Sequence, residues 1–170
     1  SPGLEQVAHP GCYLVPGFVD VHVHGVDGHD VLDDSDAVAS IAARLPRYGV
    51  TAFCPTTVAC APTALVSVLT QVARARHRPD LRGARVLRAH LESNFISAEF
   101  RGAQPVACLR CPDAHVPDGT FSGLDILQVI AAHGAEVGIV TVAPDVQGVI
   151  ELIPTLVSAG HRVSLGHSGA

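Results

Sequence analysis

The sequence contains no lysine, no tryptophan and no methionine, and these absences narrow the classes of protein to consider. All 11 basic residues are arginines that form no stripe, and 16 acidic residues give a formal net charge of -5. Nucleic-acid binding is therefore not expected. The chain has no run of about eighteen uncharged apolar residues, and residues 1–11 lack a basic stretch followed by an apolar one. We accordingly expect neither membrane insertion nor secretion.

Cysteine occurs an odd number of times, five, which is not typical of a disulfide framework in a chain of ordinary size. We expect reduced thiols and a cytoplasmic protein. Cys108 and Cys111 have C-x-x-C spacing, but no second pair follows, and neither residue opens a helix after a strand as a redox motif requires. We interpret them as two small residues in a surface insertion.

The remaining composition is that of a globular protein with one unusual excess. The 170 residues are 48% hydrophobic with a mean hydropathy of +0.33, which suffices for one sizeable core. Histidine occurs 10 times, against two tyrosines and five phenylalanines. Packing does not need so many imidazoles, so the positions of the histidines become informative.

Short apolar runs alternate with longer segments in which apolar residues recur at helical spacing. The predicted strands are residues 18–24, 50–54, 85–91, 136–142 and 161–165, and the predicted helices are residues 37–48, 62–77, 122–133 and 146–159. This alternation predicts an α/β fold of parallel strands joined by right-handed crossovers. No Gly-rich phosphate loop follows any strand, which favours a barrel over a doubly wound nucleotide-binding sheet.

Five strands and four helices are about the first half of a (β/α)8 TIM-type barrel, which typically needs about 250 residues. Half a barrel leaves two unpaired edges, so we expect a fragment of a longer polypeptide. Segment 93–121 interrupts the alternation after the third strand and would lie at the C-terminal side of the strands. In barrels this side carries the active site.

Residues of metal-ligand type stand at the C-terminal ends of three predicted strands. His22 and His24 end the first strand, Glu92 follows the third, and His167 follows the fifth. Residues two apart in a strand point the same way, so His22 and His24 would project into one space. Imidazoles and a carboxylate suit Zn2+, with cobalt, iron or manganese as alternatives. The sequence therefore predicts a divalent-metal site at this rim.

The other histidines are expected to differ in environment. His29 and His90 lie near the predicted metal site. The rest fall in loops or at helix ends and are expected at the solvated surface: His9, His77, His115, His133 and His161.

Several motifs carry a resemblance to a known family. Residues 16–25, Pro-Gly-Phe-Val-Asp-Val-His-Val-His-Gly, resemble the PGFxDxHxHG signature of the amidohydrolase superfamily. Further motifs resemble, in order, those of the N-acetylglucosamine-6-phosphate deacetylases: Gly28-His29-Asp30, Pro55-Thr56-Thr57, His90-Leu91-Glu92, Phe95-Ile96-Ser97, Arg101-Gly102-Ala103, Ala143-Pro144-Asp145 and Gly166-His167-Ser168. The match covers nearly the whole chain, and the order and spacing make it specific.

The resemblance implies a barrel accompanied by a small β-sandwich built from both chain ends. Residues 1–15 would be a remnant of that sandwich, and residues 16–170 the N-terminal half of the catalytic barrel. Glu92 and His167 would hold the catalytic metal together with a histidine beyond Ala170. His22 and His24 would support a second ion, as they do in some members. The family's acid/base, an aspartate, also falls beyond Ala170, so no catalytic acid/base is assigned within this chain.

The activity that the resemblance implies is removal of the acetyl group from N-acetylglucosamine-6-phosphate or a related N-acetyl amino sugar, with one or two zinc ions. Zinc lowers the pKa of a bound water to about 7 and polarises the carbonyl, as amide hydrolysis at neutral pH needs. The substrate would be a small-molecule amino sugar, contacted at Ala103 and Gln104. The resemblance also suggests a homodimer.

The chain departs from the family pattern in three places. Ser93 and Asn94 replace the Gly and Pro of HLEGPF, which set the backbone turn after the glutamate. Gln104 replaces the histidine of GAH, and an amide cannot carry the positive charge that favours a phosphate. Segment 105–117 lacks the usual continuation. Recognition of a 6-phosphate is thus less secure than metal-dependent hydrolysis.

Two alternatives stay open at the level of sequence. A cyclic-amide hydrolase or deaminase would be favoured by a lysine at the end of the fourth strand, but the chain has no lysine. A truncated or degenerate barrel without catalysis is favoured by the missing later strands and by Ser93, Asn94 and Gln104. The joint presence of His22, His24, Glu92 and His167 argues against such decay.

Overall fold

The computed structural model describes residues 9–33, 35–113 and 120–170, and its main feature is a parallel sheet. The sheet comprises β1 (Phe18–Val23), β4 (Val50–Thr57), β5 (Arg85–Val86), β6 (Ala89–Glu92), β7 (Val137–Val142) and β8 (Arg162–Leu165). Apart from β5, which pairs with β4, the strands lie side by side in chain order, β1-β4-β6-β7-β8. Every pairing between them is parallel.

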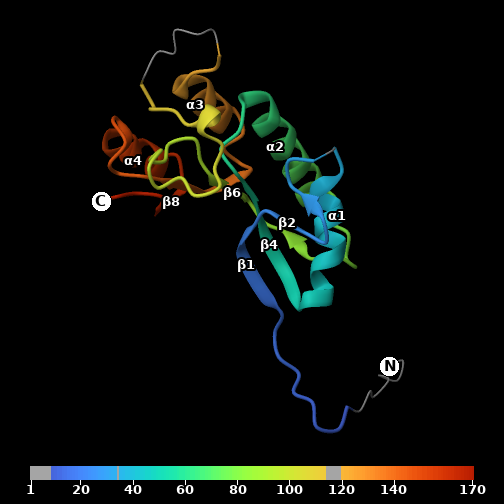
Figure 1. The fold of residues 1–170 in the computed structure, drawn as a ribbon. Helices are drawn as coiled ribbons and strands as arrows, with labels where there is room; N and C mark the ends of the chain where they lie inside the picture. The colour runs from blue at the N-terminus through green and yellow to red at the C-terminus, as the bar shows by residue number, and fades with distance from the viewer. Residues whose placement is uncertain (1–8, 34, 114–119) are drawn as a thin grey trace.

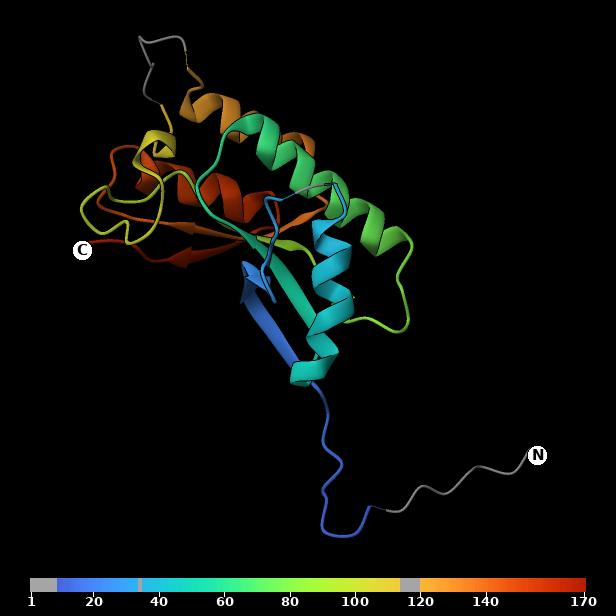
Figure 2. The same cartoon turned by 45° about the vertical axis from the view of Figure 1, so that its right-hand side comes forward.

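The helices connect successive strands and lie along one side of the sheet (Figures 1 and 2). They are α1 (Ala37–Arg44), continued by the 3-10 turn η1 (Leu45–Tyr48), α2 (Pro62–His77), α3 (Gly123–Ala132) and α4 (Val149–Ser158). A second 3-10 turn, η2 (Val106–Cys108), lies in the long loop after β6. A doubly wound sheet would carry helices on both faces. Consecutive strand order with helices on one side is the arrangement of a barrel wall, and the predicted half of a TIM-type barrel is confirmed.

The third predicted strand, residues 85–91, is wrong as a single element because the chain divides it into β5 and β6. The N–H of Leu87 still donates to the Phe53 carbonyl of β4, at 2.8 Å, whereas the N–H of Ala89 donates to the Glu136 carbonyl, at 2.6 Å. The chain thus changes its hydrogen-bonding partner between Leu87 and Ala89, and this change interrupts the strand.

Strand β4 continues through Pro55, where the sequence predicted its end. Proline has no N–H to donate and is tolerated in sheets mainly where the ladder is irregular. Pro55 stands opposite Val23, next to a shift of register in β1 between Asp20 and Val23. The irregular pairing on that side explains how the strand tolerates the proline.

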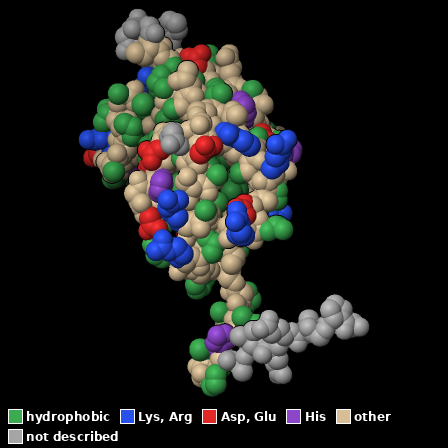
Figure 3. All heavy atoms as spheres, turned by 90° about the vertical axis from the view of Figure 1, so that its right-hand side faces the viewer, with side chains coloured by type: hydrophobic (Ala, Val, Ile, Leu, Met, Phe, Trp, Pro, Cys, Tyr) green, Lys and Arg blue, Asp and Glu red, His purple; other side chains and the backbone are tan. Residues whose placement is uncertain are grey.

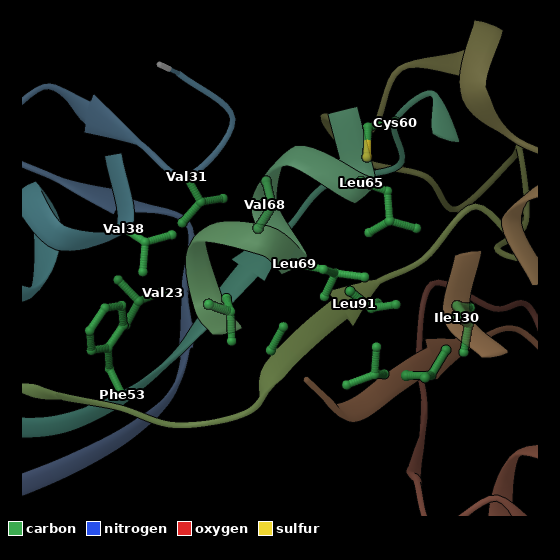
Figure 4. Packing of buried hydrophobic residues seen from close by; sticks show 14 of the residues in the cluster. Val23, Val31, Val38, Phe53, Cys60, Leu65, Val68, Leu69, Leu91 and Ile130 are labelled. Atoms are coloured by element: carbon green, nitrogen blue, oxygen red, sulfur yellow. The ribbon is translucent and has the colours of Figure 1, made fainter. Parts of the chain in front are cut away.

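The main core lies between the sheet and the helices that cover it (Figure 4). Phe53 of β4 and Leu69 of α2 are fully buried, and Leu91 of β6 and Ile130 of α3 are nearly so. Burying each such side chain stabilises the fold by roughly 1.5–3 kcal/mol. This packing fixes the strands relative to one another and therefore fixes the positions of the residues at their C-terminal ends.

The two edge strands of the sheet, β1 and β8, leave apolar side chains in solvent. Val19 and Val21 of β1 are 61% and 51% exposed, and Leu165 of β8 is 64% exposed. Residues 9–17 run away from the sheet (Figure 1) and form no strand. The assignment of residues 1–15 to a β-sandwich therefore stays a prediction.

The face formed by α1 and α2 carries positively charged arginines and negatively charged acidic side chains around an apolar hollow (Figure 3). A cavity of about 290 Å³ lies between these helices and residues 78–84, and no predicted metal ligand lines it. Among the helices of the described segments, none is long and apolar enough to span a bilayer.

Candidate metal centre

The four predicted ligands lie at the C-terminal ends of β1, β6 and β8, where His22, His24 and Glu92 form one group and His167 joins it through Glu92. His22 Nε2 lies 3.0 Å from His24 Nε2, and His24 Nε2 lies 3.2 Å from Glu92 Oε2. His167 Nε2 lies 2.8 Å from Glu92 Oε1 on the opposite side of the carboxylate. Glu92 is thus the centre of the group, with an imidazole nitrogen close to each of its oxygens.

The backbone at the end of β1 directs both imidazoles of the H-x-H pair to the same side. The intervening Val23 is buried in the core, and its N–H donates to Thr56 Oγ1 at 2.9 Å. With Val23 anchored on the core side, His22 and His24 project from the other side, where β6 ends in Glu92. Thr56 is a supporting residue to which the sequence reasoning assigned no role.

Two of the imidazole rings are oriented by hydrogen bonds from Nδ1 to backbone carbonyls. His24 Nδ1 donates to the Thr56 carbonyl at 2.9 Å, and His167 Nδ1 donates to the Phe100 carbonyl at 2.8 Å. A carbonyl can only accept, so Nδ1 carries a proton in both rings, and Nε2 is the ring nitrogen that faces Glu92. This Nδ1 arrangement is the one that metal-ligating histidines adopt.

Where an imidazole Nε2 lone pair faces a Glu92 oxygen, the contact requires a positive charge between the two atoms. Neutral His24 and His167 would each place an acceptor nitrogen against an acceptor oxygen of Glu92, and such a pair repels unless a proton or a cation intervenes. Burial lowers the pKa of His167, but the Phe100 carbonyl and the Glu92 carboxylate outweigh it and hold that pKa above its ordinary value. The donor set therefore attracts positive charge.

The separations between donor atoms fit a small divalent cation. His22, His24 and Glu92 offer one ligand atom each, all within 4.8 Å of one another. With zinc–nitrogen bonds of about 2.0–2.1 Å, the donors of a tetrahedral zinc ion lie about 3.3 Å apart. The distances from His24 Nε2 to His22 Nε2, 3.0 Å, and to Glu92 Oε2, 3.2 Å, are close to that value. The residues present thus fit the metal that the sequence predicts.

His90 lies beside the ligands but uses both of its ring nitrogens elsewhere. Its Nδ1 donates to the Val21 carbonyl at 2.9 Å, and its Nε2 accepts from Thr141 Oγ1 at 2.8 Å. Burial is the main cause that lowers the pKa of His90, so the ring stays neutral. Its ring meets that of His22 edge to face, with centroids 4.9 Å apart. His90 therefore orients His22 and is not available as a ligand.

The position of His167 depends on a backbone conformation that few residues adopt. Its φ is 53°, in the left-handed region. Directly after it, Ser168 Oγ donates to Asp145 Oδ1 at 2.6 Å, and the N–H of Gly169 donates to Asp145 Oδ2 at 3.2 Å. The Ser168 hydroxyl is the main cause that holds the pKa of Asp145 below its usual value. The sequence motif contained Asp145, but this bracing role became visible only in three dimensions.

The two residues that replace Gly and Pro after Glu92 are buried, and both side chains form hydrogen bonds. Ser93 Oγ donates to the Thr141 carbonyl at 2.5 Å and accepts from the N–H of Phe95 at 3.2 Å. Asn94 Nδ2 donates to the carbonyls of Cys60 and Cys108, at 2.8 and 2.7 Å. Ser93 thus connects the turn after β6 to β7, and Asn94 connects it to Cys60 and Cys108, so the turn is held without the family's proline.

The two predicted substrate-binding residues have different environments. Ala103 is exposed, in a loop where Gly102 lies close to the His167 ring. Gln104 is only 5% exposed, and both of its amide atoms are hydrogen-bonded within the protein. Contact with substrate at either residue stays a proposal.

The remaining histidines include one wrong prediction. His161 was expected at the surface but is buried, and its Nδ1 donates to the Val137 carbonyl at 3.0 Å, so the ring satisfies a carbonyl at the start of β7. His9 and His77 are exposed, whereas His29 and His133 are half-buried. His115 lies outside the described residues. All five cysteines are free thiols, including Cys108 and Cys111.

Comparison with known proteins identifies the relatives of this chain. No protein-family model matches it. It is 42% identical to N-acetylglucosamine-6-phosphate deacetylase from Rattus norvegicus over 172 aligned positions, which cover 98% of this chain and 39% of the relative. The human protein of the same name is 39% identical over 94% of the chain and 38% of its own length. This chain is a homologue of the N-acetylglucosamine-6-phosphate deacetylases.

Solved structures of N-acetylglucosamine-6-phosphate deacetylases share the fold. A mutant of the Mycobacterium smegmatis enzyme in complex with N-acetyl-D-glucosamine-6-phosphate matches with a TM-score of 0.74 and 26% identity, over 97% of this chain and 42% of that one. The Thermotoga maritima enzyme matches with a TM-score of 0.67 and 27% identity, over 90% of this chain and 37% of that one. The chain thus spans about two fifths of the length of these deacetylases.

Proposed function

We propose that the protein carrying this chain is a metal-dependent hydrolase that removes the acetyl group from an N-acetyl amino sugar, in the first instance N-acetylglucosamine-6-phosphate. The observation that carries the proposal is the convergence of three imidazoles on Glu92, in a chain homologous to these deacetylases over nearly its whole length. The Nε2 atoms of His22, His24 and His167 lie 3.8, 3.2 and 2.8 Å from the Glu92 oxygens. A decayed barrel would have no physical reason to keep this arrangement.

Glu92 and His167 would hold the essential ion, and His22 and His24 would complete its surroundings or hold a second one. Zinc suits this set of nitrogen and oxygen donors best. A divalent cation, when bound, lowers the pKa of water and polarises a carbonyl, which is the chemistry that amide hydrolysis requires. The chain's own residues position these ligands: Thr56 and Phe100 fix two rings through their carbonyls.

The direct test is acetate release by the full-length protein from N-acetylglucosamine-6-phosphate and from the same sugar without phosphate. Activity should disappear when a chelator removes the metal and return when Zn2+ is added. Glu92→Gln should abolish it, because the amide keeps the shape but loses the charge. The matched control is Glu99→Gln, an exposed glutamate in the loop after β6, which should leave activity unchanged. A folded, metal-loaded protein that released no acetate would instead support the non-catalytic barrel.

A second sugar belongs in the same assay. A relative from Escherichia coli O157:H7, 33% identical over 92% of this chain, is an N-acetylgalactosamine-6-phosphate deacetylase. Comparing the two epimers by kcat/KM would show which sugar the site prefers. The comparison with the unphosphorylated sugar bears on phosphate recognition, because at position 104 a neutral amide replaces the histidine of the family pattern.

We further propose that the protein is a cytoplasmic homodimer in which residues 1–15 contribute to a small β-sandwich beside the barrel. Support comes from the five free cysteines and from the family resemblance. Light scattering on the full-length protein would test the dimer, and cell fractionation would test the compartment.

A further inference from the structure

We propose that Gln104 is a positioning residue for Glu92, the carboxylate at the centre of the metal site, and that it does not serve as a substrate-binding group. The inference rests on the proposed metal-binding function. Gln104 stands where the family pattern has a histidine, and in this chain the glutamine holds one oxygen of the metal-binding carboxylate.

The hydrogen bonds of Gln104 fix which way its amide points. Its Oε1 accepts from the backbone N–H of Ala59 at 2.6 Å, and its Nε2 donates to Glu92 Oε2. In the opposite orientation the amide NH2 would face the Ala59 N–H, and the amide oxygen would face a carboxylate oxygen. Both of those contacts would be repulsive. A glutamine is therefore matched to its neighbours at both ends, in one orientation only.

The bond from Gln104 divides the two oxygens of Glu92 between different tasks. Oε2 accepts from the Gln104 amide and lies 3.2 Å from His24 Nε2, whereas Oε1 lies 2.8 Å from His167 Nε2. The Glu92 side chain is 12% exposed, so water does little to hold it in place. A buried partner that donates to one oxygen fixes the plane of the carboxylate and therefore the direction in which Oε1 presents its lone pairs.

Gln104 also ties Glu92 to the rest of the barrel rim. Ala59 and Cys60 are consecutive residues between β4 and α2, and the first is bonded by Gln104 and the second by Asn94. Both amides belong to the long loop after β6, and both stand where the family pattern has another residue. They connect the loop that follows the metal-ligating glutamate to the loop that follows β4, the strand beside β1 with its two histidines.

The experiment measures Co2+ affinity and the visible absorption of bound Co2+ in the full-length protein, for wild type, Gln104→Met and Gln104→Asn. Methionine keeps the volume and removes both hydrogen bonds, and asparagine keeps the amide but is one methylene too short to reach both partners. We expect Gln104→Met to bind Co2+ about 10–100-fold more weakly, the usual effect of losing a partner of a metal ligand, with Gln104→Asn in between. The absorption band should also change, because Glu92 becomes free to present both oxygens.

Gln71→Met is the matched control. Gln71 is another buried glutamine whose Oε1 accepts a backbone N–H, that of Val38 at 3.1 Å, and it lies in α2 away from the ligands. It should match wild type in Co2+ affinity and spectrum even if it unfolds at a lower temperature. Equal Co2+ affinities in Gln104→Met, Gln104→Asn and Gln71→Met would overturn the positioning role of Gln104 and leave the proposed metal-binding function standing. A folded wild type that bound no Co2+ would overturn the proposed function as well, so the two failures are distinguishable.

Discussion

At the scale of single residues, the site is held by backbone carbonyls and buried amides around one carboxylate. Glu92 receives contacts from His24, His167 and Gln104, and the two histidines are each oriented by a carbonyl from a different loop. Ligand geometry therefore depends on partners that a sequence pattern does not mark as functional.

Asp145 is one such partner, and Asp145→Ala should weaken divalent-metal binding by about tenfold, the lower end of the range for partners of ligands. The carboxylate is expected to act by holding Ser168 and Gly169, which follow His167. Titration of the full-length protein with Co2+ measures the effect. Asp113→Ala, at an exposed aspartate, serves as the control, and an unchanged affinity in Asp145→Ala would contradict this role.

Thiol reactivity provides a test of packing at residue scale. Burial is the main cause that raises the pKa of Cys60, to about 12, whereas Cys12 is exposed. A thiol reacts as its thiolate, so at pH 8 the Cys60 thiol should remain unmodified while Cys12 is alkylated. Because the folded pKa is raised, the fraction of reactive Cys60 rises only as the pH approaches 12 or the chain unfolds. Peptide mapping after iodoacetamide treatment measures both sites, and equal labelling of the two cysteines would contradict the buried position.

At the scale of elements, helix α3 has the most complete local signal. Ser122 Oγ accepts from the N–H of Asp125, and the Asp125 carboxylate accepts from the N–H of Ser122, a reciprocal capping box. Ser122→Ala should lower the free energy of unfolding by about 1 kcal/mol. Ser67→Ala, in the exposed interior of α2, should have no such cost, because alanine favours helix. Thermal unfolding measures the difference: Ser122→Ala should melt at a lower temperature than Ser67→Ala. Equal melting temperatures would contradict a stabilising role of the capping box.

Element types could be predicted better than element ends. The apolar periodicity predicts all four helices and the strands of the parallel sheet, with β5 and β6 as one strand. Helix α4 begins at Val149, three residues later than predicted. The cause is Gly148, whose φ of 80° lies outside the helical region. The short hairpin of β2 (Gly25–Val26) and β3 (His29–Asp30) was missed. Its turn is Asp27-Gly28, a dipeptide that favours two-residue hairpins, and both residues have a positive φ.

At the scale of the molecule, the consecutive order of parallel strands could be predicted because each helical segment is long enough for one crossover. That order brings strand ends far apart in sequence to one rim, and so His22, Glu92 and His167 could be grouped from sequence alone. The roles of Gln104 and Thr56 could not, because each depends on side-chain direction across strands or loops that are distant in sequence. The burial of His161 was missed for the same reason.

The exposed edges of the sheet predict how the 170-residue polypeptide behaves when it is produced alone. Unpaired edges at β1 and β8, with apolar Val19 and Val21 in solvent, favour association. Light scattering should show a mass that rises with concentration, and Val21→Lys should reduce the rise. The control Val66→Lys, on the surface of α2, should not. A strict monomer at every concentration would contradict this expectation.

The most direct test of the account is the metal content of the purified, dialysed full-length protein, measured by elemental mass spectrometry for wild type and Glu92→Ala side by side. We expect at least one divalent ion per wild-type chain and its loss in the variant, since Glu92 contacts His24 and His167 at the centre of the site. A demonstrably folded wild type without bound metal would contradict metal binding at Glu92 and support a barrel without catalysis.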